Sequence, residues 1–190
     1  MLVNKEKGFI FIHIWKTGGT SIRESLKIVE NSENYDCRKY KHISALKARD
    51  FLGSETYNKL HSFSVVRNPW DLQVSNYFYA RQRKEHYFHD FMMRFKCFDE
   101  YIEWRCTDGF EPQISMLSDN NKKIIVDSIL RFESLDVEFN QICANIGIKL
   151  NLNKLNTSKH DYYKNYYSDF SKKLIESSFK CDIDAFGYQW

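Results

Sequence analysis

Hydrophobic and polar positions near the start of the chain follow first the period of a strand and then the period of a helix. Residues 8–14 are β-branched or aromatic with almost no charge, which predicts a strand buried on both faces of a parallel sheet. After a turn at residues 16–21, apolar residues recur at helical spacing as far as Val29. Ser21 and Glu24 form the S-x-x-E pattern of a capping box, which marks a helix start. We therefore expect a strand, a glycine turn and a helix in direct succession.

The same order returns further along the chain. Residues 62–66 form a short apolar run, and Asn68 and Pro69 follow with the preferences of an N-cap and of a first helical residue. The second helix is therefore predicted to begin directly after Arg67. This position lies at the carboxyl end of a strand, where ligands bind in open α/β sheets.

Between these two patterns lie a predicted loop and a predicted helix. Residues 31–41 are polar with charges of both signs, and they predict a loop without a packing role that borders the active site. Ile43, Leu46 and Phe51 fall on one face of a helix that Gly53 closes as a C-cap.

The second half of the chain predicts further helices and strands. Residues 85–104 are dense in aromatic side chains, which favours a helical core, and residues 113–135 predict one or two strands around a turn at residues 119–122. Residues 137–146 predict an amphipathic helix. A last helix has the inward side chains Leu174, Ile175 and Phe179. Together these patterns predict an α/β fold with a central, mainly parallel sheet flanked by helices.

The turn after the first strand carries groups that bind an anion. Adjacent glycines let backbone N–H groups turn toward a ligand, and the helix N-terminus adds partial positive charge. A lysine and hydroxyl groups supply further donors. The candidate residues are Lys16, Thr17, Gly18, Gly19, Thr20 and Ser21. The lysine precedes the glycines, whereas the P-loop of nucleotide triphosphatases places it after the last glycine.

This order resembles the 5′-phosphosulfate loop of sulfotransferases, and KTGGTS at residues 16–21 is similar to the loop of the carbohydrate sulfotransferases. RNPWDLQVSNY at residues 67–77 resembles the 3′-phosphate motif of the same enzymes. The resemblance implies that Arg67 and Ser75 hold the 3′-phosphate of the nucleotide. It extends to KHISALKARDFLG, ILRFESL and DIDAFGYQW, which are similar to segments of the bacterial members of sulfotransferase family 2.

Two positions depart from the family's pattern. Trp15 stands where the family usually has proline, which predicts a reshaped start of the loop. Leu72 stands where it usually has arginine, which predicts the loss of one charge on the helix surface. Neither residue is a predicted phosphate ligand.

Composition narrows the class of protein. With 190 residues and 43% apolar content, we expect residues 1–190 to form a single domain. The net charge of +3 is too small to indicate a nucleic-acid partner, but it is compatible with an anionic ligand. The five cysteines are scattered without a C-x-x-C, which favours reduced thiols and a cytoplasmic location over disulfides or a zinc site. Neither a membrane span nor a signal peptide is predicted.

The histidines offer a general base rather than a metal site. No H-x-x-x-H or H-E-x-x-H pattern occurs, so we expect no metal. His42 resembles in position the catalytic histidine of the carbohydrate 2-O-sulfotransferases, and it should have a pKa near the working pH. His61 is the rival, but it opens a strand at the end opposite to the ligands. The alternative for His42 is an exposed helix-cap residue.

The resemblance implies transfer of a sulfuryl group from 3′-phosphoadenosine-5′-phosphosulfate (PAPS) to an acceptor hydroxyl on a carbohydrate, as a glycan or glycolipid. Lys16 and His42 would be catalytic. Residues 31–41 and 85–109 are the regions expected to select the acceptor. Two alternatives remain, an ATP-dependent small-molecule kinase and a non-catalytic nucleotide-binding module of the same fold. Against the kinase, the sequence lacks a Walker lysine and a candidate aspartate for magnesium. A magnesium-dependent ATPase assay would distinguish the kinase from the sulfotransferase.

Overall fold

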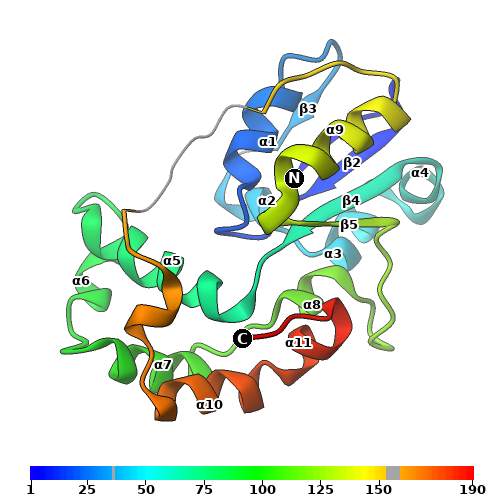
Figure 1. Cartoon of the computed structure of the whole chain (residues 1–190). Coiled ribbons are helices and arrows are strands. Elements are labelled where there is room, and N and C mark those ends of the chain that lie inside the picture. The colour runs from blue at the N-terminus through cyan, green and yellow to red at the C-terminus, as the bar shows by residue number, and fades with distance from the viewer. Residues whose placement is uncertain (36, 153–158) are drawn as a thin grey trace. The chain divides into compact units, whose positions relative to one another are not determined.

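A computed structural model describes residues 1–35, 37–152 and 159–190 (Figure 1). The chain divides into two compact units. We call Met1–Val66 with Gln113–Asn156 the sheet unit, and Arg67–Pro112 with Thr157–Trp190 the helical unit.

The sheet unit is built on a mixed five-stranded sheet in the order β3-β1-β2-β4-β5. The strands are β1 (Leu2–Asn4), β2 (Phe9–Ile12), β3 (Glu33–Asn34), β4 (His61–Val66) and β5 (Ser128–Arg131). β4 runs parallel to both β2 and β5, whereas β1 is antiparallel to β2 and β3. The predicted α/β class is confirmed in its coarse form, a sheet with parallel strands flanked by helices. The prediction of a mainly parallel sheet is wrong for the β3-β1-β2 part, because a tight hairpin through Gly8 (φ 71°) folds β1 back onto β2, and β3 pairs antiparallel with β1.

Helices α1 (Gly19–Leu26) and α9 (Leu135–Asn145) cover one face of this sheet, as Figure 1 shows. Phe11 and Phe63 from the central strands pack there with Ile22 of α1 and Phe139 of α9. Ile10 and Ile12 alternate with these positions along β2 and are also fully buried. The prediction that this strand is buried on both faces is therefore confirmed.

Shorter helices complete the sheet unit. They are α2 (Arg38–Lys41), α3 (Ala45–Leu52), α4 (Ser54–Lys59), α8 (Gln113–Leu117) and η1 (Phe132–Ser134). Gly53 caps α3 with a φ of 82°, as predicted. The buried face of α3 carries Ala45 and Ala48, however, and Phe51 is 44% exposed.

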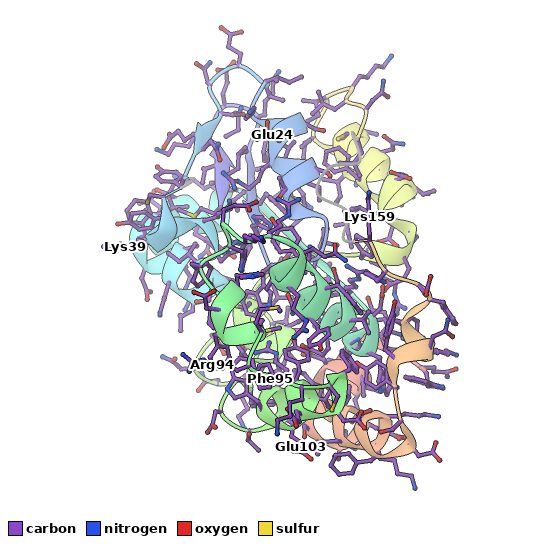
Figure 2. The ribbon with its side chains drawn as sticks, turned by 90° about the vertical axis from the view of Figure 1, so that its left-hand side faces the viewer. Glu24, Lys39, Arg94, Phe95, Glu103 and Lys159 are labelled. Atoms are coloured by element: carbon purple, nitrogen blue, oxygen red, sulfur yellow. The ribbon has the colours of Figure 1, made fainter. Side chains whose placement is uncertain are left out.

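The helical unit packs around a second, aromatic core. Its helices are α5 (Pro69–Gln82), α6 (His89–Met92), α7 (Phe98–Cys106), η2 (Tyr163–Tyr166), α10 (Asp169–Ser178) and α11 (Lys180–Phe186). Tyr101, Ile175 and Phe179 are buried in this core, which confirms the core assignment of the aromatic-rich segment and of the last helix. In Figure 2, Phe95 lies among these aromatic rings and Glu103 at the outer surface.

Three local predictions need correction. The capping box at Ser21 does not form, because α1 already begins at Gly19 and Ser21 belongs to its first turn. Glu24 pairs instead with Lys27. Residues 113–117 form helix α8 rather than a strand, since Gln113, Met116 and Leu117 are buried at helical spacing. The turn and the following strand β5 are present as expected.

Residues 31–41 have a packing role that the sequence did not indicate. β3 extends the sheet by pairing with β1, and the Asn34 side chain accepts a 2.7 Å hydrogen bond from buried Arg23 of α1. The ring of Tyr35 packs edge-on against Phe51 at 5.5 Å. Polar residues can fill such a position because a strand edge pairs through its backbone.

Candidate active site

The predicted anion cradle, residues 16–21, joins the end of β2 to the start of α1 in the sheet unit. Lys16 and Gly18 both lie in the left-handed region, with φ of 61° and 80°. For a residue with a side chain this conformation costs about 1–2 kcal/mol. Strain of this kind is typical of ligand sites, and here it turns the chain sharply into the N-terminus of α1.

Neighbouring side chains leave no room for a Cβ at either of the two glycines of the cradle. A Cβ at Gly18 would come within 2.7 Å of Cδ2 of Leu135, and a Cβ at Gly19 within 1.9 Å of Cδ2 of His13. Neither position accepts a side chain without movement of these groups. The N-cap and the first residue of α1 therefore carry no side chain, and the backbone N–H groups and helix dipole at this end suit a phosphate or sulfate group.

The three hydroxyl residues of the cradle differ in burial. Thr17 is fully buried, and its hydroxyl donates a 2.8 Å hydrogen bond to the carbonyl of Ile14. Its proton is therefore committed to the loop itself, so the backbone N–H is the group that Thr17 offers an anion. Ser21 is buried in the first turn of α1, whereas Lys16 and Thr20 are half-buried.

His42 lies beside this cradle, as the sequence predicted. Its ring centroid is 4.3 Å from that of His13, the residue whose ring contacts Gly19. The indole of Trp15 packs edge-on to His42 at 6.3 Å. A main-chain hydrogen bond fixes the protonation of the ring, because Nδ1 of His42 lies 2.9 Å from the carbonyl oxygen of His13. A carbonyl only accepts, so Nδ1 carries the hydrogen and Nε2 keeps a free lone pair.

Burial makes both histidines weak bases. Desolvation lowers the pKa of His42 from 6.5 to about 4, although the hydrogen bond to His13 opposes this shift. Desolvation also lowers the pKa of His13 well below its ordinary value, and the positive charge that His42 would carry adds to the effect. His42 is therefore neutral at pH 7, with the lone pair of Nε2 unprotonated. The expected pKa near the working pH is wrong, because the ring is buried and the sequence did not reveal this burial.

His61 lies where the strand pattern put it, at the start of β4 opposite Phe9 of β2. Its Nε2 is 2.9 Å from the hydroxyl of Ser128 on the neighbouring strand. This cross-strand contact gives His61 a structural role at the amino end of the parallel strands.

Arg67 and Ser75 belong to the helical unit. Asn68 caps α5 by accepting hydrogen bonds from the N–H groups of Trp70 and Asp71, which confirms the predicted helix start. Arg67 is 7% exposed and Ser75 is 1% exposed. Asp71 and Ser75 are spaced by four and so share one face of α5, and Arg67, directly before the N-cap, contacts Asp71.

Asp71 is the residue that sequence analysis missed in this motif. Its Oδ2 accepts a 2.8 Å hydrogen bond from Nε of Arg67. The i,i+4 spacing of opposite charges was the available signal. Asp71 orients the guanidinium and neutralises part of its charge.

The two departures from the family's pattern have different consequences. Trp15 contributes the edge-on contact to His42 and thus shapes the start of the loop. Leu72 is 1% exposed, so the expected loss of a surface charge is wrong: position 72 is buried.

Within residues 1–35, 37–152 and 159–190, no group of three or more His, Cys, Asp or Glu side chains is arranged to hold a metal ion. Over the same residues, no helix has the length and apolar character needed to span a bilayer.

A sheet whose central strand leads through a glycine turn into a helix, with a neutral histidine beside the turn, is compatible with a protein that binds an anionic group. A model described as "Sulfotransferase family" matches residues 1–189. The chain therefore belongs to sulfotransferase family 2. The comparison with curated proteins gave no match.

Proposed function

We propose that this protein transfers a sulfuryl group from PAPS to an acceptor hydroxyl on a carbohydrate, as a glycan or glycolipid. The observation that carries the proposal is the cradle at residues 16–21 with His42 beside it, in a chain of the sulfotransferase family. We further propose that both units together form one transferase domain with the P-loop-like sulfotransferase fold. The family match across residues of both units supports this.

The residues of the cradle fit the 5′-end of such a donor. Gly18 and Gly19 leave the N-cap and the first residue of α1 without side chains, so backbone N–H groups at this end are available to anionic oxygens. PAPS supplies the activated sulfuryl group when it is bound. Lys16 stabilises the negative charge on the bridging oxygen as its bond to sulfur breaks. Thr17, Gly18, Gly19, Thr20 and Ser21 hold the 5′-phosphate.

Arg67 and Ser75 are proposed to bind the 3′-phosphate. Arginine offers several N–H donors in a rigid fork, and Asp71 engages the one on Nε. The burial of both side chains supports a selective role, since a buried arginine favours a ligand that supplies a second negative charge.

His42 is the proposed general base. Its Nε2 takes the proton of the acceptor hydroxyl as the new oxygen–sulfur bond forms. The imidazolium that results keeps its Nδ1–H hydrogen bond to the His13 carbonyl, which stabilises the positive charge.

The proposed transfer requires no metal. Lysine, arginine and backbone donors neutralise the charge for which a kinase uses magnesium.

The cytoplasmic location stays a prediction. The described residues include five free cysteines, of which Cys37, Cys97 and Cys181 are exposed. Exposed thiols without partners are compatible with a reducing compartment.

A transfer assay tests the proposed function. The purified protein is incubated with PAPS labelled in the sulfuryl group and with a panel of glycans, glycolipids and phenols. We expect labelled product from a carbohydrate acceptor without added metal, and no magnesium-dependent hydrolysis of ATP. Binding of adenosine 3′,5′-bisphosphate without transfer to any acceptor would favour the non-catalytic module, and metal-dependent ATP turnover would favour the kinase.

A further inference from the structure

Three rings form a ladder from the core of the sheet unit to the candidate base. Phe11 of β2 stacks on His13 with centroids 5.7 Å apart and an angle of 23° between the planes. His13 in turn contacts His42 at 4.3 Å. Phe11 is also packed against Phe63 of β4 at 5.2 Å. His42 is therefore connected, through successive ring contacts, to the buried aromatic side chains of the central strands.

His13, the middle ring of this ladder, places a polar side chain in a buried position. It is 2% exposed, and its Nδ1 is buried with no hydrogen-bond partner among the described residues. Leaving a buried polar atom unsatisfied costs about 1–3 kcal/mol, which an apolar side chain would avoid. Such costs persist where a residue serves a site rather than the core.

His13 touches both parts of the proposed site. The Cδ2–Nε2 edge of its ring lies against Gly19, so closely that a Cβ there would be 1.9 Å from Cδ2 and 2.2 Å from Nε2. Its main-chain carbonyl receives the Nδ1–H of His42. One residue therefore contacts the first turn of α1 with its ring, and the candidate base with both its ring and its backbone.

We propose that His13 is a positioning residue for His42, which it holds at two points in the Nδ1–H tautomer beside the cradle. The hydrogen bond to the carbonyl determines which nitrogen carries the proton. Alone, however, it would break whenever the imidazole turned about its side-chain bonds, and Nε2 could then carry the hydrogen instead. The ring of His13 prevents this rotation, and Phe11 and Gly19 confine that ring from two sides. The proposal rests on the proposed function only for its effect on turnover; the tautomer itself is independent of any activity.

The tautomer of His42 is measured directly by nitrogen-15 NMR of the imidazole groups in the full-length protein. Wild type should show a neutral His42 with its hydrogen on Nδ1 throughout pH 6 to 8. His13→Leu removes the ring and should give a mixture of tautomers. His13→Phe keeps a ring without nitrogens and should restore the Nδ1–H form. His61→Leu is the matched control, since it removes a strand histidine level with Phe9 and should leave the His42 signals unchanged.

Kinetics give the second readout. His13→Leu should lower kcat by about 10- to 100-fold through misplacement of the base, while KM for PAPS stays close to that of wild type. His13→Phe should recover most of the turnover. Circular dichroism and thermal melting establish that each variant is folded. If the His13 variants do not fold, Phe11→Leu loosens the ladder one ring further back and should shift the tautomer in the same direction by less.

The outcomes separate the two proposals. An Nε2–H tautomer in wild type, or an unchanged His42 spectrum in a folded variant that lacks the ring, overturns the role of His13. A shifted tautomer with unchanged turnover supports the role of His13 and shows instead that His42 is not the base, which contradicts the proposed mechanism.

Discussion

Arg67, directly before the N-cap of α5, forms an ion pair with Asp71 in the first turn of that helix. The Nε–Oδ2 distance is 2.8 Å, and the side chains are only 8% and 17% exposed. A carboxylate so close to the arginine reduces its net attraction for a phosphate, but it also keeps the guanidinium in one orientation. The balance between these two effects is open to experiment.

Variants at Arg67 and Asp71 test the proposed 3′-phosphate site. Wild type should bind adenosine 3′,5′-bisphosphate far better than AMP, and Arg67→Ala should erase this difference. Asp71→Asn keeps an acceptor for Nε but loses the negative charge, so it should bind the bisphosphate more tightly. Asp71→Ala loses the acceptor as well and should bind it more weakly. Calorimetric titration measures all four proteins, and equal losses for both nucleotides in Arg67→Ala would refute the assignment.

Lys16 combines a proposed catalytic charge with a strained backbone. Lys16→Ala should lower turnover by about 100- to 1000-fold, the usual loss for one electrostatic donor. Lys16→Gly should lose the same activity but unfold at a higher temperature than Lys16→Ala, because glycine adopts a φ of 61° without strain. Lys27→Ala, at the end of α1, is the matched control for losing a lysine. Turnover in Lys16→Ala close to that of wild type would exclude the proposed role.

His42→Ala should lower turnover by about 100- to 10,000-fold, as expected for loss of a general base. Affinity for adenosine 3′,5′-bisphosphate should stay nearly intact, because His42 is not a proposed phosphate ligand. His61→Ala should instead lower mainly the free energy of unfolding, since it breaks the contact with Ser128. If His42→Ala transfers sulfate at close to the wild-type rate, the base lies elsewhere.

Gly19→Ala should destabilise the protein by about 1–3 kcal/mol, because its Cβ would force the ring of His13 to move. Gly53→Ala is a useful comparison: that site has a φ of 82° but no atom within 4 Å of a Cβ, so its cost is strain alone. Adding His13→Ala to Gly19→Ala should recover part of the stability. A double-mutant cycle from urea unfolding gives the coupling, and strict additivity would contradict the contact.

Stability should fall on mild acidification because of His42 and His13. Between pH 6.5 and about 4, His42 is protonated in the unfolded chain but neutral in the folded protein. The free energy of unfolding therefore decreases as the pH falls through this range. The contribution of neutral His42 to the free energy of unfolding is fully present above pH 6.5. One histidine changes this free energy by at most about 1.4 kcal/mol per pH unit. Urea unfolding from pH 7.5 to 4.5 measures it. His42→Gln should show a shallower dependence than wild type, and an identical slope would exclude the effect.

Much of the site could be predicted from sequence because its signals are local. The apolar run before Lys16, the adjacent glycines and the pair Asn68–Pro69 each act within a few residues. Strand pattern, left-handed turn and N-cap are therefore readable without knowledge of the fold. The position of Arg67 at the end of β4 follows from the same local pattern.

Contacts between distant segments were decided only by the tertiary structure. His42 meets the carbonyl of His13 across 29 residues of sequence, and this contact selects the tautomer and buries the ring. The antiparallel pairing of β1 and the burial of Leu72 likewise depend on which surfaces meet in the folded chain. The sequence by itself thus determined the strand, the glycine turn and the helix of the candidate cradle, since these follow from short-range pattern, and it offered His42 as the candidate base through resemblance to family enzymes. The charge state and orientation of that base were decided by desolvation and packing, which depend on neighbours far away along the chain.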